Sequence, residues 1–114
     1  MEPGNNIPRY YTFGSGFEAN SAAKHLEKRQ EEGHYTSLTA EQYEAKALEL
    51  LQMNVDGDIA GYETKSGKIV RWNKSTNDYA TGVINNCIKT MFPLRGGQER
   101  FDKLRAYDQK EDIQ

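Results

Sequence analysis

The chain has 114 residues, of which 36% are hydrophobic and 28% charged, so we expect one domain with a single modest core. Its seven tyrosines, four phenylalanines and one tryptophan favour an ordered fold over a disordered chain. No apolar run approaches the roughly 18 residues of a membrane span, and the first residues lack the pattern of a signal peptide. The single cysteine, Cys87, excludes an internal disulfide and a cysteine-based zinc site, and we expect it in the core.

The net charge is only −2, but the charges are unevenly distributed along the chain. Residues 1–63 carry five Lys/Arg and eleven Asp/Glu, a net charge of −6, whereas residues 64–105 carry nine and three, a net charge of +6. Residues 106–114 add −2. An acidic half joined to a basic half indicates one face suited to an anionic partner, with ordinary surface charge as the alternative.

The first half of the chain has the patterns of helices. Residues 1–16 are expected to form an extended arm, because Pro and Gly recur there without periodicity. A helix is predicted over about residues 17–32, with Gly33 as its stop signal. A second helix is predicted to begin after Thr39, because Thr39-Ala-Glu-Gln42 has the pattern of a capping box, and to end near Met53. Its apolar stripe comprises Tyr43, Ala47, Leu50 and Leu51.

The second half has the patterns of short strands and tight turns. Strands are predicted over residues 59–62, 68–72, 78–82 and 87–92. The short turns between them imply an antiparallel meander, because parallel strands need longer crossovers. A final helix is predicted over about residues 98–107, followed by a charged tail at 108–114. The order of elements predicts an α+β fold, with N-terminal helices packed on an antiparallel sheet of at least four strands and a short C-terminal helix.

Four spaced segments carry a resemblance to a known superfamily. They are Lys24-His-Leu-Glu-Lys28, Thr39-Ala-Glu-Gln-Tyr-Glu-Ala-Lys-Ala-Leu-Glu-Leu50, Gly67-Lys-Ile-Val-Arg-Trp-Asn-Lys-Ser-Thr-Asn-Asp-Tyr-Ala80 and Asn86-Cys-Ile-Lys-Thr-Met-Phe-Pro93. In this order they resemble the toxin members of the barnase–EndoU–colicin–RelE ribonuclease superfamily, which include C-terminal nuclease domains of bacterial contact-dependent growth inhibition and polymorphic toxin systems. The chain departs from the pattern at Asn73 and Asn86, and Pro93 follows Phe92 without a spacer.

The resemblance implies a ribonuclease toxin domain over residues 17–107. Such a domain would cleave RNA, with transfer RNA the commonest target among relatives, through attack of the 2′-OH on the adjacent phosphate and without a metal or cofactor. It would be delivered as part of a larger secreted protein and act in the cytoplasm of a target cell. A cognate acidic immunity protein would bind it in a 1:1 complex, the free toxin being a monomer.

This chemistry needs a base, an acid and groups that stabilise the phosphorane. His25, at the position that the resemblance implies, is the first choice for acid or base, and an exposed helix residue is the alternative. His34 is the alternative catalytic histidine or an ordinary loop residue. Arg71, expected on an apolar face of its strand, would grip the scissile phosphate or pair with an acidic residue of a helix.

Short polar and basic side chains of the basic half complete the predicted site. Thr76, Asn77 and Thr90 would orient the phosphate, or else serve only as turn and strand formers. Lys68, Lys89 and Arg95 are assigned electrostatic contacts with RNA. No metal site is predicted, because the sequence has no Asp/Glu/His cluster at metal-ligand spacing.

Two other classes of protein compete with the nuclease. One is a phage- or secretion-derived module of the same fold that binds RNA or protein without catalysis, and loss of the catalytic His and Arg would mark it. The other is an immunity or adaptor protein, which we expect to be acidic throughout. His25 and Arg71 are present and residues 64–105 are basic, so the sequence favours the nuclease.

Overall fold

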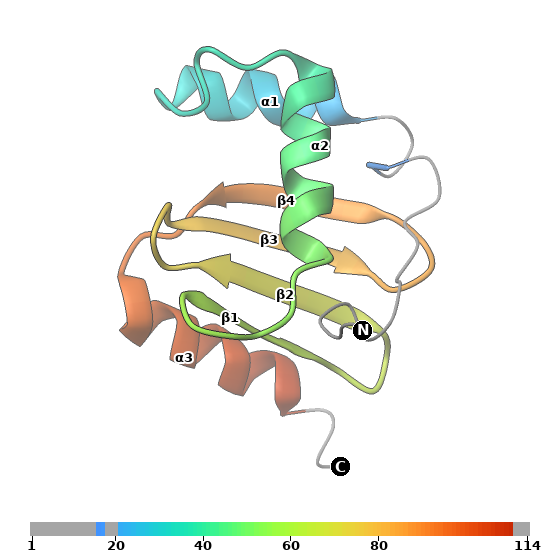
Figure 1. The fold of residues 1–114 in the computed structure, drawn as a ribbon, viewed down its shortest axis with the longest axis vertical. Coiled ribbons are helices and arrows are strands. Elements are labelled where there is room, and N and C mark those ends of the chain that lie inside the picture. Colours follow the sequence, from blue (N-terminus) through green and yellow to red (C-terminus); the bar gives the residue numbers. More distant parts are fainter. Residues whose placement is uncertain (1–15, 18–20, 111–114) are drawn as a thin grey trace.

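The computed structural model describes residues 16–17 and 21–110. Along the chain it forms α1 (Ala22–Glu31), α2 (Ala40–Leu51), β1 (Ile59–Glu63), β2 (Lys68–Asn73), β3 (Asp78–Val83), β4 (Ile88–Pro93) and α3 (Gly97–Gln109). The strands make one antiparallel sheet in the order β1-β2-β3-β4 (Figure 1). The α+β class and the meander are therefore confirmed. Residues 1–15 of the arm predicted over 1–16 and residues 111–114 of the predicted tail lie outside the described residues.

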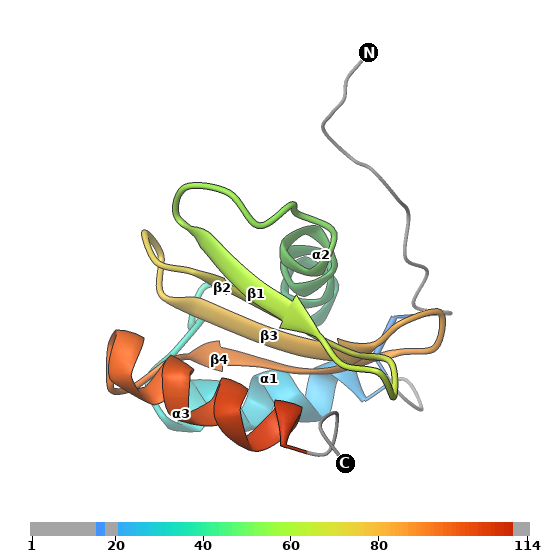
Figure 2. The ribbon, with the colours of Figure 1, turned by 90° about the horizontal axis from the view of Figure 1, so that it is seen from below.

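Both faces of the sheet are covered by helices. α2 crosses one face, with α1 beside it near β4, and α3 lies on the opposite face (Figures 1 and 2). Because side chains of a strand alternate between faces, β2 contributes Ile69 to the core under α2 and Val70 and Trp72 to the core under α3. Cys87 is buried, as expected.

The start of α2 forms as the sequence indicates. The Thr39 hydroxyl accepts from the Gln42 N–H at 3.2 Å, and the Gln42 side chain accepts from the Thr39 N–H at 2.9 Å. This capping box satisfies two N–H groups that the helix itself leaves unpaired. The predicted stripe is buried against the sheet and comprises Tyr43, Ala47, Leu50 and Leu51.

The start of α1 differs from the prediction. The helix begins at Ala22 rather than at residue 17. Phe17 instead forms a parallel bridge with Ile88, because the Gly16 carbonyl accepts from the Ile88 N–H at 2.9 Å. The ring of Phe17 is buried and stacks on Tyr43 with a centroid distance of 5.4 Å. A long-range packing contact thus overrides the helical composition of this segment.

The end of α3 also differs, since the helix continues past the predicted end at residue 107 to Gln109. Asp108 accepts a hydrogen bond of 2.5 Å from the Tyr62 hydroxyl and one of 2.9 Å from the Lys68 ammonium. These two contacts fix the last turn of α3 to β1 and β2, so residues expected in the charged tail belong to the fold.

A β-bulge in β4 decides which side chains face which helix. Thr81 is in register with Thr90 and Gly82 with Ile88, so Lys89 is the extra residue of the bulge. The extra residue places both Ile88 and Met91 in the core under α2. Thr90 therefore shares the α3 side of the strand with Phe92.

Candidate functional site

A pocket of about 320 Å³ opens where β4 ends, between the end of α1 and the start of α3. Three of its side chains are arginines, one is a histidine and one is a carboxylate. The lining residues are Arg29, Glu32, His34, Phe92, Pro93, Leu94, Arg95 and Arg100. The surplus of guanidinium groups over carboxylates makes this β4 pocket suited to an anion.

Arg29 is the partly buried cation of the β4 pocket, with a side chain that is 13% exposed. One of its terminal nitrogens donates to Glu32 at 3.0 Å, the other to the Thr90 hydroxyl at 3.4 Å. The guanidinium also lies 5.3 Å from the centre of the Phe92 ring. Arg29 thus links α1 to two side chains on the α3 side of β4.

One donor of Arg29 is left over. Its Nε is buried and has no hydrogen-bond partner among the described residues. A buried N–H without an acceptor costs on the order of 1–3 kcal/mol, so the guanidinium group of Arg29 is held in place at a cost to stability. Among the described residues it is the buried side-chain N or O atom without a hydrogen-bond partner.

The connector after α1 holds His34 at the β4 pocket. The His34 N–H donates to the Arg29 carbonyl at 2.9 Å, after Gly33 has turned the chain with a φ of 90°. Tyr35 follows with a φ of 55°, which is uncommon for an aromatic residue. The Gln30 side chain donates to the Tyr35 carbonyl at 3.0 Å. These contacts define the backbone on both sides of the imidazole.

Asp78 anchors this connector to the sheet. Its carboxylate is buried and accepts from the Tyr35 hydroxyl at 2.7 Å and the Thr76 hydroxyl at 2.8 Å, while the Lys46 ammonium lies 3.3 Å away. Burial raises the pKa of Tyr35 well above its ordinary value, and the hydrogen bond to Asp78 raises it further. The phenol therefore remains a donor at neutral pH, and the helical half stays tied to β3 behind the β4 pocket.

Tyr43 of α2 lies beside the same group of side chains. Its hydroxyl donates to the Met91 carbonyl at 2.5 Å. Burial raises the pKa of Tyr43, and the positive charge of Arg29 opposes part of this rise. Arg29 and Thr90 are thus backed by a protonated phenol rather than by a second charge.

Several of the predicted site residues lie at or next to the β4 pocket. His34 and Arg95 line it, and Thr90 contacts Arg29. Asn77 supports it from behind, because its side-chain amide donates to the carbonyl of the lining residue Leu94 at 2.8 Å.

Thr76 and the two predicted RNA-binding lysines lie elsewhere. The Thr76 hydroxyl donates to Asp78, so it belongs to the network behind the connector. Lys68 forms an ion pair at 2.9 Å with Asp108, in the last turn of α3, whereas the pocket is at the first turn of that helix. Lys89 is the exposed, bulged residue of β4 and does not line the pocket.

The phosphate role predicted for Arg71 is corrected by its contacts. Its Nε donates to the Met53 carbonyl at 2.8 Å, and its terminal nitrogens donate to the Val70 carbonyl at 2.9 Å and to Glu63 at 2.6 Å. The side chain crosses β1 at Gly61, where an added Cβ would lie 2.7 Å from its Cδ. Arg71 is a structural residue, and its acidic partner stands on a strand rather than on the expected helix.

His25 lies outside the β4 pocket as well. Its ring packs at 5.1 Å from the ring of Phe17, which pairs with the first residue of β4, Ile88, whereas the pocket is at the last one, Pro93. Arg71 contacts β1 and the end of α2 instead. The predicted meeting of His25 and Arg71 around one phosphate is therefore not formed.

Sequence reasoning missed Arg29, Glu32 and Arg100. One signal was available, because Arg29 follows His25 by four residues and shares its helix face, with Glu32 one turn further. The charges of Arg29 and Glu32 are typical of an exposed helix, however. Only the approach of α1 to the edge of β4 makes them part of a site.

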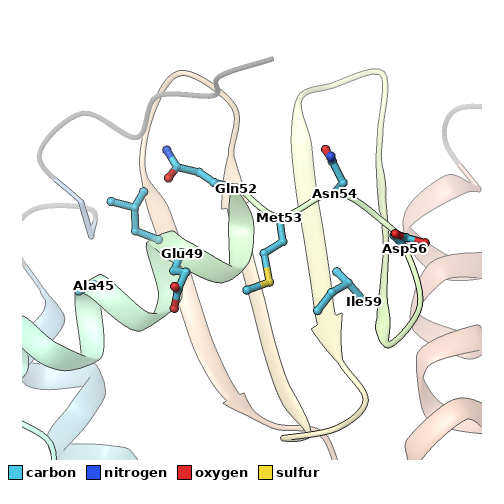
Figure 3. Close-up of a pocket in the computed structure, with 8 residues that line it drawn as sticks. Ala45, Glu49, Gln52, Met53, Asn54, Asp56 and Ile59 are labelled. Carbon is cyan, nitrogen blue, oxygen red and sulfur yellow. The ribbon is translucent and has the colours of Figure 1, made fainter. Parts of the chain in front are cut away.

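A larger cavity of about 570 Å³ lies between α2 and the loop that leads into β1. Leu48, Met53 and Ile59 give it apolar walls, and Glu49 and Asp56 stand at it (Figure 3). Two carboxylates without a basic residue in the lining repel a phosphate. This α2 groove is therefore not a candidate for the site of RNA chemistry.

Neither a protein-family model nor a curated protein matches the chain. Within residues 16–17 and 21–110, no three His, Cys, Asp or Glu side chains gather in a way that would hold a metal ion. None of the helices in this described part is long and apolar enough to cross a membrane.

Proposed function

We propose that this protein is an endoribonuclease toxin domain, and that the β4 pocket binds the scissile phosphate of RNA. The observation that carries the proposal is the lining of this pocket, where the guanidinium groups of Arg29, Arg95 and Arg100 outnumber the single carboxylate and His34 stands beside them. A phosphodiester offers oxygen acceptors for several guanidinium groups at once. The resemblance of the four sequence segments to ribonuclease toxins supports the same chemistry.

The lining of the β4 pocket supplies each part of the reaction. Glu32 takes the proton of the 2′-OH as the base, and the 2′-oxygen then attacks the phosphorus. Protonated His34 gives its proton to the departing 5′-oxygen, so the products are a 2′,3′-cyclic phosphate and a free 5′-OH. Arg29, Arg95 and Arg100 stabilise the extra negative charge of the phosphorane. No step requires a metal or a cofactor.

The partners follow from the same proposal. A cognate immunity protein would place acidic groups over the β4 pocket, where charge complementarity speeds association. Two further parts of the proposal rest on the resemblance. One is the RNA target, which is transfer RNA among relatives of this type. The other is delivery within a larger secreted protein into the cytoplasm of a target cell.

The proposal is tested by incubating the purified protein with RNA in excess EDTA. We expect cleavage by the wild type and, for His34→Ala, a rate lower by about 100-fold or more, because a positioned acid contributes at least that much. His25→Ala is the matched control and should retain most activity. Loss in His25→Ala but not in His34→Ala would reassign the acid, and a wild type that leaves RNA intact would contradict the proposal.

A further inference from the structure

One flank of α3 combines exposed cationic side chains with one exposed aromatic ring. The residues recur at helical spacing on one side of the helix and comprise Arg100, Lys103, Tyr107 and Lys110. The opposite side is buried or bonded to the sheet, through Phe101 in the core and Asp108 with Tyr62. We call the first set the α3 flank.

Tyr107 differs from the other aromatic residues on this side of the sheet. Tyr62, Trp72 and Tyr79 each contact the Phe101 ring, with centroid distances between 5.2 and 6.4 Å. Tyr107 is 76% exposed, and its ring makes no hydrogen bond or ring contact with another described side chain. The fold does not use this ring, so it is available to a ligand.

The α3 flank is continuous with the β4 pocket. Arg100 belongs to both, because it lines the pocket from the first turn of α3. Tyr107 stands two turns further, about 10 Å along the helix axis, a distance that roughly three stacked nucleotides span. Lys103 and Lys110 lie about one turn before and after Tyr107. The Lys103 ammonium also lies 4.0 Å from the Glu99 carboxylate, in an exposed ion pair that a phosphate can replace.

We propose, resting on the function proposed above, that the α3 flank binds the RNA strand beyond the scissile phosphate. Tyr107 stacks on an unpaired nucleobase, while Lys103 and Lys110 contact backbone phosphates. Stacking on an aromatic side chain requires a base that is free of its own stack, as in single strands and loops. The substrate is therefore RNA that is unpaired next to the cleaved bond, with little dependence on base identity.

The first test is binding of a labelled single-stranded RNA, followed by fluorescence anisotropy in the His34→Ala background so that the RNA stays intact. Tyr107→Ala should raise the Kd about tenfold, because stacking of one base contributes that much, and Tyr107→Trp should bind as tightly as the parent. The control is Val55→Ala. Val55 lies on the loop before β1 and is 53% exposed, and with Tyr107 it makes up the exposed large apolar side chains of the described residues. An unchanged Kd in Tyr107→Ala would overturn the inference.

The second test separates this inference from the proposed nuclease. In the protein that keeps His34, Tyr107→Ala should raise KM for single-stranded RNA. The same variant should cleave a dinucleotide as fast as the parent, since a dinucleotide does not reach Tyr107. Equal KM values on the long RNA would overturn the inference while the nuclease stands. A wild type that binds RNA through Tyr107 but cleaves none would contradict the nuclease and leave the RNA surface in place.

Discussion

Arg29 and Arg71 both have largely buried side chains beside the same sheet, but at opposite edges of it. At the β1 side, all three nitrogens of Arg71 donate to protein oxygens, one of them in Glu63. At the β4 side, Arg29 makes two side-chain hydrogen bonds and its buried Nε makes none within the described residues. The difference teaches that burial of an arginine does not by itself indicate a role in binding, and that the partners of its guanidinium group and the charges around it must be compared.

The cavities at the two edges differ in the same way. The β4 pocket has three arginines and one carboxylate in its lining, whereas the α2 groove near β1 has two carboxylates and no basic residue. The cavity at the β1 side is the larger of the two. Charge rather than volume therefore makes the β4 side the better fit to an anion.

The largest expected effects come from replacing the two arginines, Arg29 and Arg71, one at a time. Arg29→Ala should lower the rate of RNA cleavage by about 100- to 1000-fold, because it removes a preorganised donor to the phosphorane. Its thermal unfolding midpoint should stay close to that of the wild type, since the variant also removes an unpaired buried N–H. Cleavage rates and circular dichroism melts check both parts, and full activity of Arg29→Ala would exclude it from the site.

The corresponding change at the β1 side, Arg71→Ala, should lower stability and leave activity unchanged. Arg71→Ala should lower the free energy of unfolding by about 3 kcal/mol, because it leaves two carbonyls and Glu63 without their donor. Urea unfolding measures this loss. Cleavage per folded molecule should be unchanged at temperatures where the variant is folded, and a stable but inactive Arg71→Ala would restore the phosphate role predicted from the sequence.

A rise to alkaline pH should lower the free energy of unfolding, because two tyrosines are buried with their hydroxyl groups protonated. Burial raises the pKa of Tyr79 from 10.0 to about 12 and also raises that of Tyr35. The unfolded chain therefore loses these protons first, so the stability they contribute is present below about pH 10 and falls as the pH rises above it, with the contribution of Tyr79 lost as the pH rises through about 12. Tyr35→Phe should be less stable than the wild type at neutral pH, by about 1 kcal/mol, and should lose less on going to about pH 11. Parallel urea titrations at both pH values test this, and identical losses would contradict it.

Elements with a local cause were predictable from the sequence. The capping box of Thr39 and Gln42 needs only neighbouring residues, and so do the short turns between the strands. The start of α1 was not predictable, because Phe17 pairs with Ile88 of a distant strand. The same holds for the end of α3, which Tyr62 and Lys68 retain through Asp108.

The residues of the β4 pocket were predictable only in part, because contacts between distant parts of the chain bring them together. His34, Thr90 and Arg95 were named from the sequence and stand at the β4 pocket. The roles of Arg29 and Arg71 depend on which oxygen atoms the fold brings to each guanidinium group. Residue type and strand alternation carry no information about those partners.

The central claim is that the β4 pocket positions an RNA phosphodiester for attack by its own 2′-OH. The most direct test compares an RNA oligonucleotide with the same oligonucleotide carrying a single 2′-deoxynucleotide at the cleaved position, both in EDTA. We expect the first to yield a 2′,3′-cyclic phosphate and a 5′-OH end, and the second to remain intact at that position. Cleavage of the 2′-deoxy bond, or failure to cleave the all-ribose strand, would contradict the claim.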